Sequence, residues 1–167
     1  MNLKELERFI ADIGEQKFRA RQIYKWISSG AESFEEMTDL SKNLRQKLEE
    51  VAAVRTLELL KVQESVGDHT RKFLFALEDG NTIETVFMKY KYGNSVCISS
   101  QAGCRMGCTF CASGIGGLKR NLTAGEMLEQ VLSASRQTGE KINHVVVMGT
   151  GEPFDYYLNL AQFLELI

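Results

Sequence analysis

The 167-residue sequence has no apolar run approaching the roughly 18 residues that a membrane-spanning helix requires. Its N-terminus, Met1-Asn-Leu-Lys-Glu-Leu-Glu, has no apolar signal core, and no repeat or proline-rich linker interrupts the chain. Histidine is scarce, and we assign neither His69 nor His144 a catalytic role. With 44% hydrophobic and 25% charged residues, these absences predict a globular cytoplasmic protein with no membrane partner.

Acidic residues are missing between Glu84 and Glu126, although the whole chain carries a net charge of −2. We therefore expect a locally positive field in this interval, able to attract an anionic backbone such as RNA. Chance local imbalance is the alternative. The basic residues of the interval are Lys89, Lys91, Arg105, Lys119 and Arg120.

The first third of the chain is expected to be helical. Apolar spacing predicts helices over residues 3–13, stopped by Gly14, and over residues 20–27, with Gly30 at the end. Ser33-Phe-Glu-Glu36 has the form of a capping box that begins a short helix. A further helix is predicted by the apolar stripe Leu40, Leu44, Leu48 and Val51.

Together these helices predict a compact module over residues 1–53. On its second helix Lys17, Arg21 and Lys25 recur every four residues and so share a face. This basic row is either an RNA-phosphate surface or an ordinary solvated helix face.

Residues 54–94 change to a strand pattern. Phe73, Phe75 and Leu77 alternate with other residues, Asp79-Gly80 supplies a turn, and residues 83–87 continue beyond it, which predicts a β-hairpin linker region.

Residues 95–167 have the pattern of βα units. A strand over 96–99 leads into a cysteine-containing loop, and a capping box at Thr123 opens a helix. An apolar strand over 145–148 and a helix from about Asp155, still running at Ile167, follow. The pattern indicates a parallel α/β barrel. Two such strands cannot bury their own faces, so we expect a fragment or a component that further chain completes. The helix stripe is Ala124, Met127, Leu128, Val131 and Leu132.

Three of the four cysteines, Cys104, Cys108 and Cys111, fall within eight residues. In a chain without an export signal this spacing predicts metal ligands rather than disulfides. Thiolates suit both iron–sulfur clusters and zinc. A structural zinc would need a fourth ligand, from Cys97 or His144, whereas three ligands on a four-iron cluster leave one iron open.

A glycine-rich segment, Gly149-Thr-Gly-Glu-Pro153, follows the second apolar strand. Its glycines allow close approach of a ligand, and the Glu152 carboxylate at a strand end can receive an ammonium group. An ordinary glycine-rich turn between a strand and a helix is the alternative.

Taken in order, these motifs resemble one known family. Cys-x-x-x-Cys-x-aromatic-Cys is the signature of the radical S-adenosylmethionine (SAM) enzymes. The segments Cys97-Ile-Ser-Ser-Gln-Ala-Gly-Cys104, Arg120-Asn-Leu-Thr123 and Gly149 to Pro153 resemble those of the RNA adenine C2-methyltransferases, the RlmN family and its relative Cfr. The resemblance covers nearly the whole chain.

The resemblance implies a set of roles. Cys104, Cys108 and Cys111 would bind a [4Fe–4S] cluster whose open iron holds SAM, and Gly151 and Glu152 would contact SAM. Thr150 stands where the family commonly has Met, which leaves the backbone contacts of the loop intact. Glu84 would accept the proton, and Cys97 would help resolve a covalent RNA–enzyme intermediate.

The implied reaction is methylation of C2 of an adenosine in 23S rRNA and in tRNA, within a partial radical SAM barrel. The resemblance also implies an electron donor, such as flavodoxin or ferredoxin, as a partner. It further implies a disulfide bond, for which we assign no particular cysteines. No cysteine follows Cys111 to carry the methyl group, so this chain alone is not expected to complete the reaction. The rival readings are another radical SAM enzyme and a zinc-stabilised RNA-binding module.

Overall fold

The computed structural model describes residues 1–167. The chain divides into two compact units, a helical unit, Met1–Arg55, and a sheet unit, Thr56–Ile167. None of the helices combines the length and the apolar character that crossing a bilayer requires. All four cysteines are free thiols, so the implied disulfide is not formed among them.

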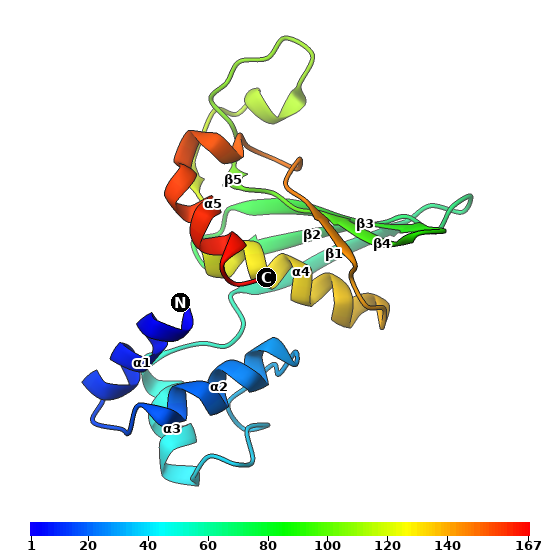
Figure 1. Cartoon of the computed structure of the whole chain (residues 1–167). Helices are drawn as coiled ribbons and strands as arrows, with labels where there is room; N and C mark the ends of the chain where they lie inside the picture. The colour runs from blue at the N-terminus through cyan, green and yellow to red at the C-terminus, as the bar shows by residue number, and fades with distance from the viewer. The chain divides into compact units, whose positions relative to one another are not determined.

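The helical unit contains three helices, α1 (Leu3–Asp12), α2 (Phe18–Ser28) and α3 (Lys42–Val51), close to the predicted positions (Figure 1). Asn2 and Glu5 form a capping box at the start of α1, and the Ser41 hydroxyl accepts a hydrogen bond from the Leu44 amide at the start of α3. The apolar faces meet in one core, to which the helices contribute Leu6, Ile10, Ala20, Ile23, Leu44 and Leu48.

The short helix predicted from Ser33 does not form. The Ser33 hydroxyl lies 3.2 Å from the Glu36 carboxylate and donates to it, so it does not accept from an amide as a helix cap would. Hydrogen bonds from the Met37 amide to the Phe34 carbonyl, and from the Leu40 amide to the Met37 carbonyl, form successive turns instead. These turns bury all three apolar side chains, which explains the helix-like spacing of the segment.

The sheet unit is built on a five-stranded sheet with the order β1-β2-β3-β4-β7. Every neighbouring pair is antiparallel except β4 and β7, which are parallel. The predicted hairpin is confirmed, with its turn at Gly80 in the left-handed region at φ 78°. The strands are β1 (Leu57–Glu64), β2 (Arg71–Leu77), β3 (Thr82–Tyr90), β4 (Gly93–Cys97) and β7 (His144–Val146).

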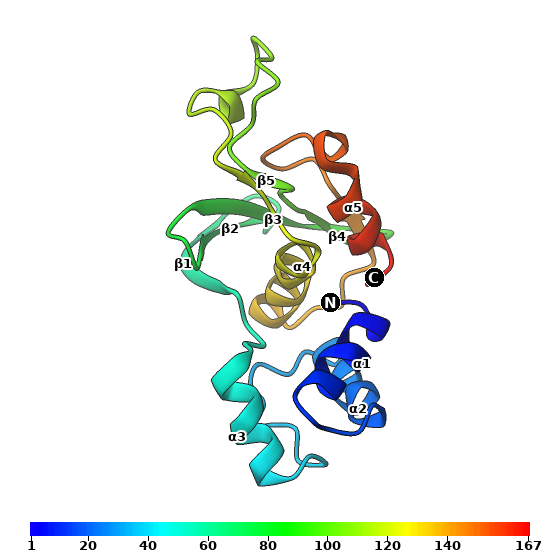
Figure 2. The same cartoon turned by 90° about the vertical axis from the view of Figure 1, so that its left-hand side faces the viewer.

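One face of this sheet is covered by α4 (Ala124–Thr138) and α5 (Tyr157–Leu164), as Figures 1 and 2 show. The capping box at Thr123 is confirmed. The predicted apolar stripe of α4 is only partly correct, because its buried face also includes Glu129, Gln130 and Ser133. The core combines Phe73, Phe75, Ile83, Phe87, Val96 and Ile98 from the sheet side with Met127, Ala134, Leu160 and Phe163 from the helices.

The last two elements are shorter than predicted. β7 ends at Val146, and Met148 is 78% exposed because β7 is an edge strand and the chain turns away after it. Residues Pro153–Tyr156 form a 3-10 turn, and α5 then ends at Leu164 rather than continuing to Ile167. Strand β1, which the sequence analysis did not predict, lacks a clean alternation of buried and exposed residues.

The opposite face of the sheet has no helix of this unit over it (Figure 1). Because side chains alternate along a strand, the residues between the core positions point to this open face. The predicted ranges 54–94 and 95–167 share this one sheet. The residues of the open face are Lys72, Leu74, Glu84, Val86 and Cys97.

Arg120 joins the turn of the hairpin to the start of α4. Its guanidinium contacts Asp79 and lies 2.7 Å from a Glu126 carboxylate oxygen. The Arg120 hydrogen bond lowers the pKa of Asp79 from 3.8 to about 2. Burial alone would raise the pKa of Glu126, but Arg120 and Thr123 hold it below the ordinary 4.5.

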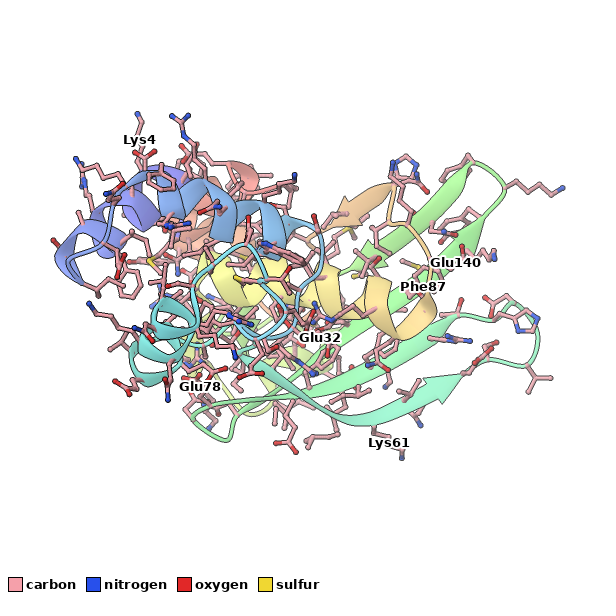
Figure 3. All side chains as sticks on the ribbon, turned by 90° about the horizontal axis from the view of Figure 1, so that it is seen from below. Lys4, Glu32, Lys61, Glu78, Phe87 and Glu140 are labelled. Atoms are coloured by element: carbon pink, nitrogen blue, oxygen red, sulfur yellow. The ribbon has the colours of Figure 1, made fainter.

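The pKa values of Asp79 and Glu126 are lower in the folded than in the unfolded chain. These carboxylates therefore stabilise the fold at pH values above their unfolded pKa values, and this stabilisation is lost on acidification. The melting temperature of the sheet unit should therefore fall from about pH 5 to about pH 2, and Arg120→Met should flatten this dependence. Melting curves across this range test it. The matched control is Lys61→Met, at an exposed β1 lysine (Figure 3), which should leave the slope unchanged.

Candidate active site

The candidate site lies where β4 and β7 end side by side. The Ile98 amide donates to the Val146 carbonyl and the Gly149 amide to the Ile98 carbonyl, both at 2.9 Å, so the parallel pairing continues beyond the strands. A Cβ on Gly149 would lie 2.8 Å from the Ile98 carbonyl oxygen, which only glycine avoids. The two predicted functional loops therefore leave the sheet together.

The cysteine loop, residues 103–119, leaves from β5 (Gln101–Ala102) and returns through β6 (Arg120–Asn121). Figures 1 and 2 show that it stands away from the sheet. Cys104, at its base, is buried, whereas Cys108 and Cys111 are exposed near its tip. The Cys111 amide donates to the Cys108 carbonyl at 3.1 Å, which forms a turn before the 3-10 segment η1 (Ala112–Gly114).

The three thiols are not gathered into a coordination sphere, and no group of side chains in the structure is arranged to hold a metal ion. The donor set nevertheless fits a cluster, because it consists of three free thiols on a glycine-containing loop. Hydrogen bonds from the Ser113 hydroxyl and amide lower the pKa of Cys111, which favours the thiolate that binds metals.

The second loop, residues 149–153, packs against the start of the cysteine loop. Gly151 has φ +107°, and a Cβ there would lie 2.5 Å from Gln101 Cβ. One Glu152 carboxylate oxygen accepts a hydrogen bond from the Phe154 amide at 3.1 Å, and the other has no partner. The buried Ser100 hydroxyl, also without a partner, lines a cavity of about 10 Å³ beside Glu152, which is too small for a nucleoside.

Gln101 connects the two loops, and the sequence analysis assigned it no role. Its side chain is 1% exposed. Oε1 accepts a hydrogen bond from the Glu152 amide at 3.0 Å, and Nε2 donates to Asn121 at 2.8 Å and Asp155 at 2.9 Å. The carboxylate of Asp155 also pairs with Arg105 of the cysteine loop at 2.6 Å. A single buried amide therefore fixes the position of one loop relative to the other.

Glu84 and Cys97 come together on the open face of the sheet. Cys97 pairs with Val86 across β3 and β4, so Glu84 is its diagonal neighbour on the same face. The Glu84 carboxylate lies 2.8 Å from the Lys72 ammonium group. The Ser99 hydroxyl donates to the Glu84 carbonyl at 2.7 Å and accepts from the Thr150 amide at 3.0 Å, which links this pair to the second loop.

Burial raises the pKa of the Cys97 thiol, and a hydrogen bond with the Met148 backbone only partly opposes this shift. Cys97 therefore differs from Cys111, whose pKa is lowered. The half-buried thiol on the sheet and the exposed thiol on the loop therefore lie in different environments.

Comparison with known proteins identifies the family. The N-terminal domain of ribosomal RNA large subunit methyltransferases matches residues 1–54. Over its whole length the chain is 52% identical to a probable dual-specificity RNA methyltransferase RlmN of Desulforamulus reducens and 53% identical to one of Lachnospira eligens. The chain belongs to the RlmN family. It spans 48% of each of these two RlmN proteins, about half of their length.

The fold agrees with this RlmN assignment. The crystal structure of a radical SAM methyltransferase from Sphaerobacter thermophilus matches 99% of the chain with a TM-score of 0.93 and 40% identity. The match covers 50% of that protein. The structural likeness thus includes both units of the RlmN-family chain and the region of the two loops.

The charge near the RlmN-family site is less positive than the sequence suggested. Acidic residues that lie outside the interval or at its end neutralise three of the five basic residues between Glu84 and Glu126. Only Lys91 and Lys119 of this interval make no ion pair. In the basic row of α2, Arg21 pairs with Glu7 at 3.7 Å. The three neutralising pairs are Lys89 with Glu140, Arg105 with Asp155, and Arg120 with Glu126.

Proposed function

We propose that this chain supplies the cluster-binding and SAM-binding part of a radical SAM methyltransferase. Its substrate would be C2 of an adenosine in 23S rRNA and in tRNA, in the cytoplasm, with flavodoxin or ferredoxin as electron donor. The observation that carries the proposal is the buried Gln101, which holds the cysteine loop against the Gly149–Pro153 loop. A fixed relation between these loops is what a cofactor shared by both would require.

Cys104, Cys108 and Cys111 would hold a [4Fe–4S] cluster. When bound, this cluster supplies the electron that breaks a carbon–sulfur bond of SAM and produces a radical. Gly151 lets the backbone approach SAM closely, and the unpartnered oxygen of Glu152 would accept a hydrogen bond from the SAM ammonium group.

Glu84 would remove the proton from C2, because replacing the hydrogen of an aromatic carbon by a methyl group must end with proton loss. The Lys72 ammonium group, 2.8 Å away, orients its carboxylate. Cys97, on the same face, would help to release the RNA from its covalent attachment to the enzyme. The methyl-carrying cysteine that the resemblance implies is not among these four, so these 167 residues alone would not yield methylated RNA.

The parallel pair β4 and β7 would be the first two strands of a partial (β/α) barrel, with the open face of the sheet toward its interior. Residues 1–53 would form an accessory RNA-binding module. Lys17, the residue before α2, and Lys25 on α2 make no ion pair, which leaves them available to phosphates.

Anaerobic reconstitution with iron and sulfide tests the cluster. We expect about four irons per chain and cleavage of SAM to 5′-deoxyadenosine in the presence of a reductant. Cys108→Ser should lose the cluster because it removes one of three ligands. Cys97→Ser is the matched control and should keep its iron. One tightly held zinc that depends on Cys97 would instead support the zinc-stabilised RNA-binding module.

A further inference from the structure

The turn that joins β3 to β4 exposes two stacked tyrosines. The rings of Tyr90 and Tyr92 lie 5.0 Å apart at an interplanar angle of 7°. Tyr92 is 71% exposed and Tyr90 44% exposed. The His144 ring, at the start of β7, meets Tyr92 edge-on at 5.7 Å. These three rings, here called the aromatic platform, contribute little to the core, so their packing inside the unit does not explain them.

The charge around the aromatic platform is positive. Lys91 lies between the two tyrosines in the sequence and makes no ion pair. The acidic residue placed against the turn is Glu140, which Figure 3 labels, and both of its carboxylate oxygens are occupied. One contacts Lys89 at 2.6 Å, and the other accepts a hydrogen bond from the Asn94 side chain at 3.3 Å. An anionic ligand would therefore meet the unpaired Lys91, and neither carboxylate oxygen of Glu140 would be free.

The platform is held rigidly. The Asn94 amide donates to the Asn143 side-chain oxygen, and the Asn143 amide donates to the Asn94 carbonyl, both at 2.9 Å. Gly93 has φ +134°, and a Cβ there would lie 3.0 Å from the same Asn143 oxygen. The turn and the segment before β7 are thus fixed to each other, so a ligand would bind without first ordering them.

We propose that the aromatic platform stacks an unpaired base of an RNA strand, with Lys91 contacting a neighbouring phosphate. Exposed aromatic rings beside unpaired basic residues are the usual means of holding single-stranded nucleic acid, because every base has a face that stacks. The proposal rests on RNA being the substrate class. It adds an RNA contact at the end of β4 opposite Cys97.

The position on the sheet favours RNA over a protein electron donor. β4 spans five residues, so the platform lies roughly 15 Å from Cys97 along the strand, and the cysteine loop begins beyond that residue. An electron donor docked at the platform would sit on the wrong side of the sheet unit. An RNA strand is long enough to reach both the platform at one end of β4 and the cysteine loop beyond the other end.

The test is a titration of a dye-labelled, unstructured RNA 10-mer with the full chain, followed by fluorescence anisotropy. Tyr92→Ala should weaken binding about 5- to 10-fold, because one stacking contact is lost. Tyr92→Phe keeps the ring and should bind within about two-fold of the wild type. Lys91→Ala should reduce the slope of log affinity against log salt by roughly 0.7. The matching RNA duplex, whose bases are not free to stack, should not respond to Tyr92→Ala.

Equal RNA affinity of the wild type and Tyr92→Ala would overturn the proposal, and so would an equal loss in Tyr92→Phe and Tyr92→Ala. If Tyr92→Ala slowed reduction of the cluster by flavodoxin and left RNA affinity unchanged, the platform would be a protein-binding surface. That result would also overturn the proposal. Iron content and SAM cleavage are measured on the same variants. Their failure in the wild type would refute the radical SAM chemistry while a Tyr92-dependent RNA affinity still supported the platform.

Discussion

The Gly103→Ala variant should destabilise the sheet unit by about 3 kcal/mol and fail to assemble a cluster. Gly103 lies at the base of the cysteine loop with φ +75°, and a Cβ there would lie 2.0 Å from the Gly117 carbonyl oxygen. That oxygen belongs to the backbone, so relief of the contact requires the loop to open at its base. Opening would separate β5 from β6 and displace Cys104, the next residue.

Gly117→Ala is the matched control for this variant. Gly117 lies in the same loop with φ +64°, but a Cβ there meets nothing within 4 Å. Gly117→Ala should lower the free energy of unfolding by only about 1 kcal/mol, the cost of holding alanine in a left-handed backbone conformation. This variant should keep its iron. Urea unfolding should be followed by far-ultraviolet circular dichroism, because the single tryptophan, Trp26, belongs to the helical unit. Equal losses of stability in the two variants would show that the backbone contact is unimportant.

The parts of the fold that the sequence predicted correctly depend on local signals. The hairpin follows from the alternation of Phe73 and Phe75 with their neighbours, and the start of α4 follows from the Thr123 capping box. Each signal is contained within a few residues, so no tertiary information is needed. The box at Ser33 shows the limit of such reasoning, because burial of Phe34 and Met37 in turns outweighed the local preference.

The site was predicted less completely, for a different reason. The loop residues were proposed from the cysteine spacing and from the family resemblance, but the contacts that join the loops come from residues far apart in the chain. Gln101 and Asp155 are separated by 54 positions, and no local pattern links an amide with a carboxylate at that separation. The same limit explains the overestimated positive field, since the acids that neutralise Arg105 and Lys89 lie outside the interval between Glu84 and Glu126.

Gln101→Leu should have the second large effect. Leucine has a similar size but no polar atoms, so the Glu152 amide and the Asn121 side-chain oxygen would lose their partner. We expect a loss of about 3 kcal/mol from the sheet unit, because buried polar groups left unpaired keep their full desolvation cost. SAM cleavage should fall by about 100-fold, since a small displacement of the second loop misplaces the bound cofactor.

The same substitution at an exposed glutamine separates these effects from a general response to leucine. Gln63→Leu on β1 should change stability by no more than about 0.5 kcal/mol and leave SAM cleavage intact. Iron content supplies a further distinction, because the Gln101 side chain makes no hydrogen bond with any of the three cysteines. We therefore expect Gln101→Leu to keep most of its iron while it loses SAM cleavage. A variant that lost iron and cleavage in equal proportion would show that Gln101 supports the cysteine loop itself, and that its contact with Glu152 has no separate role in placing SAM.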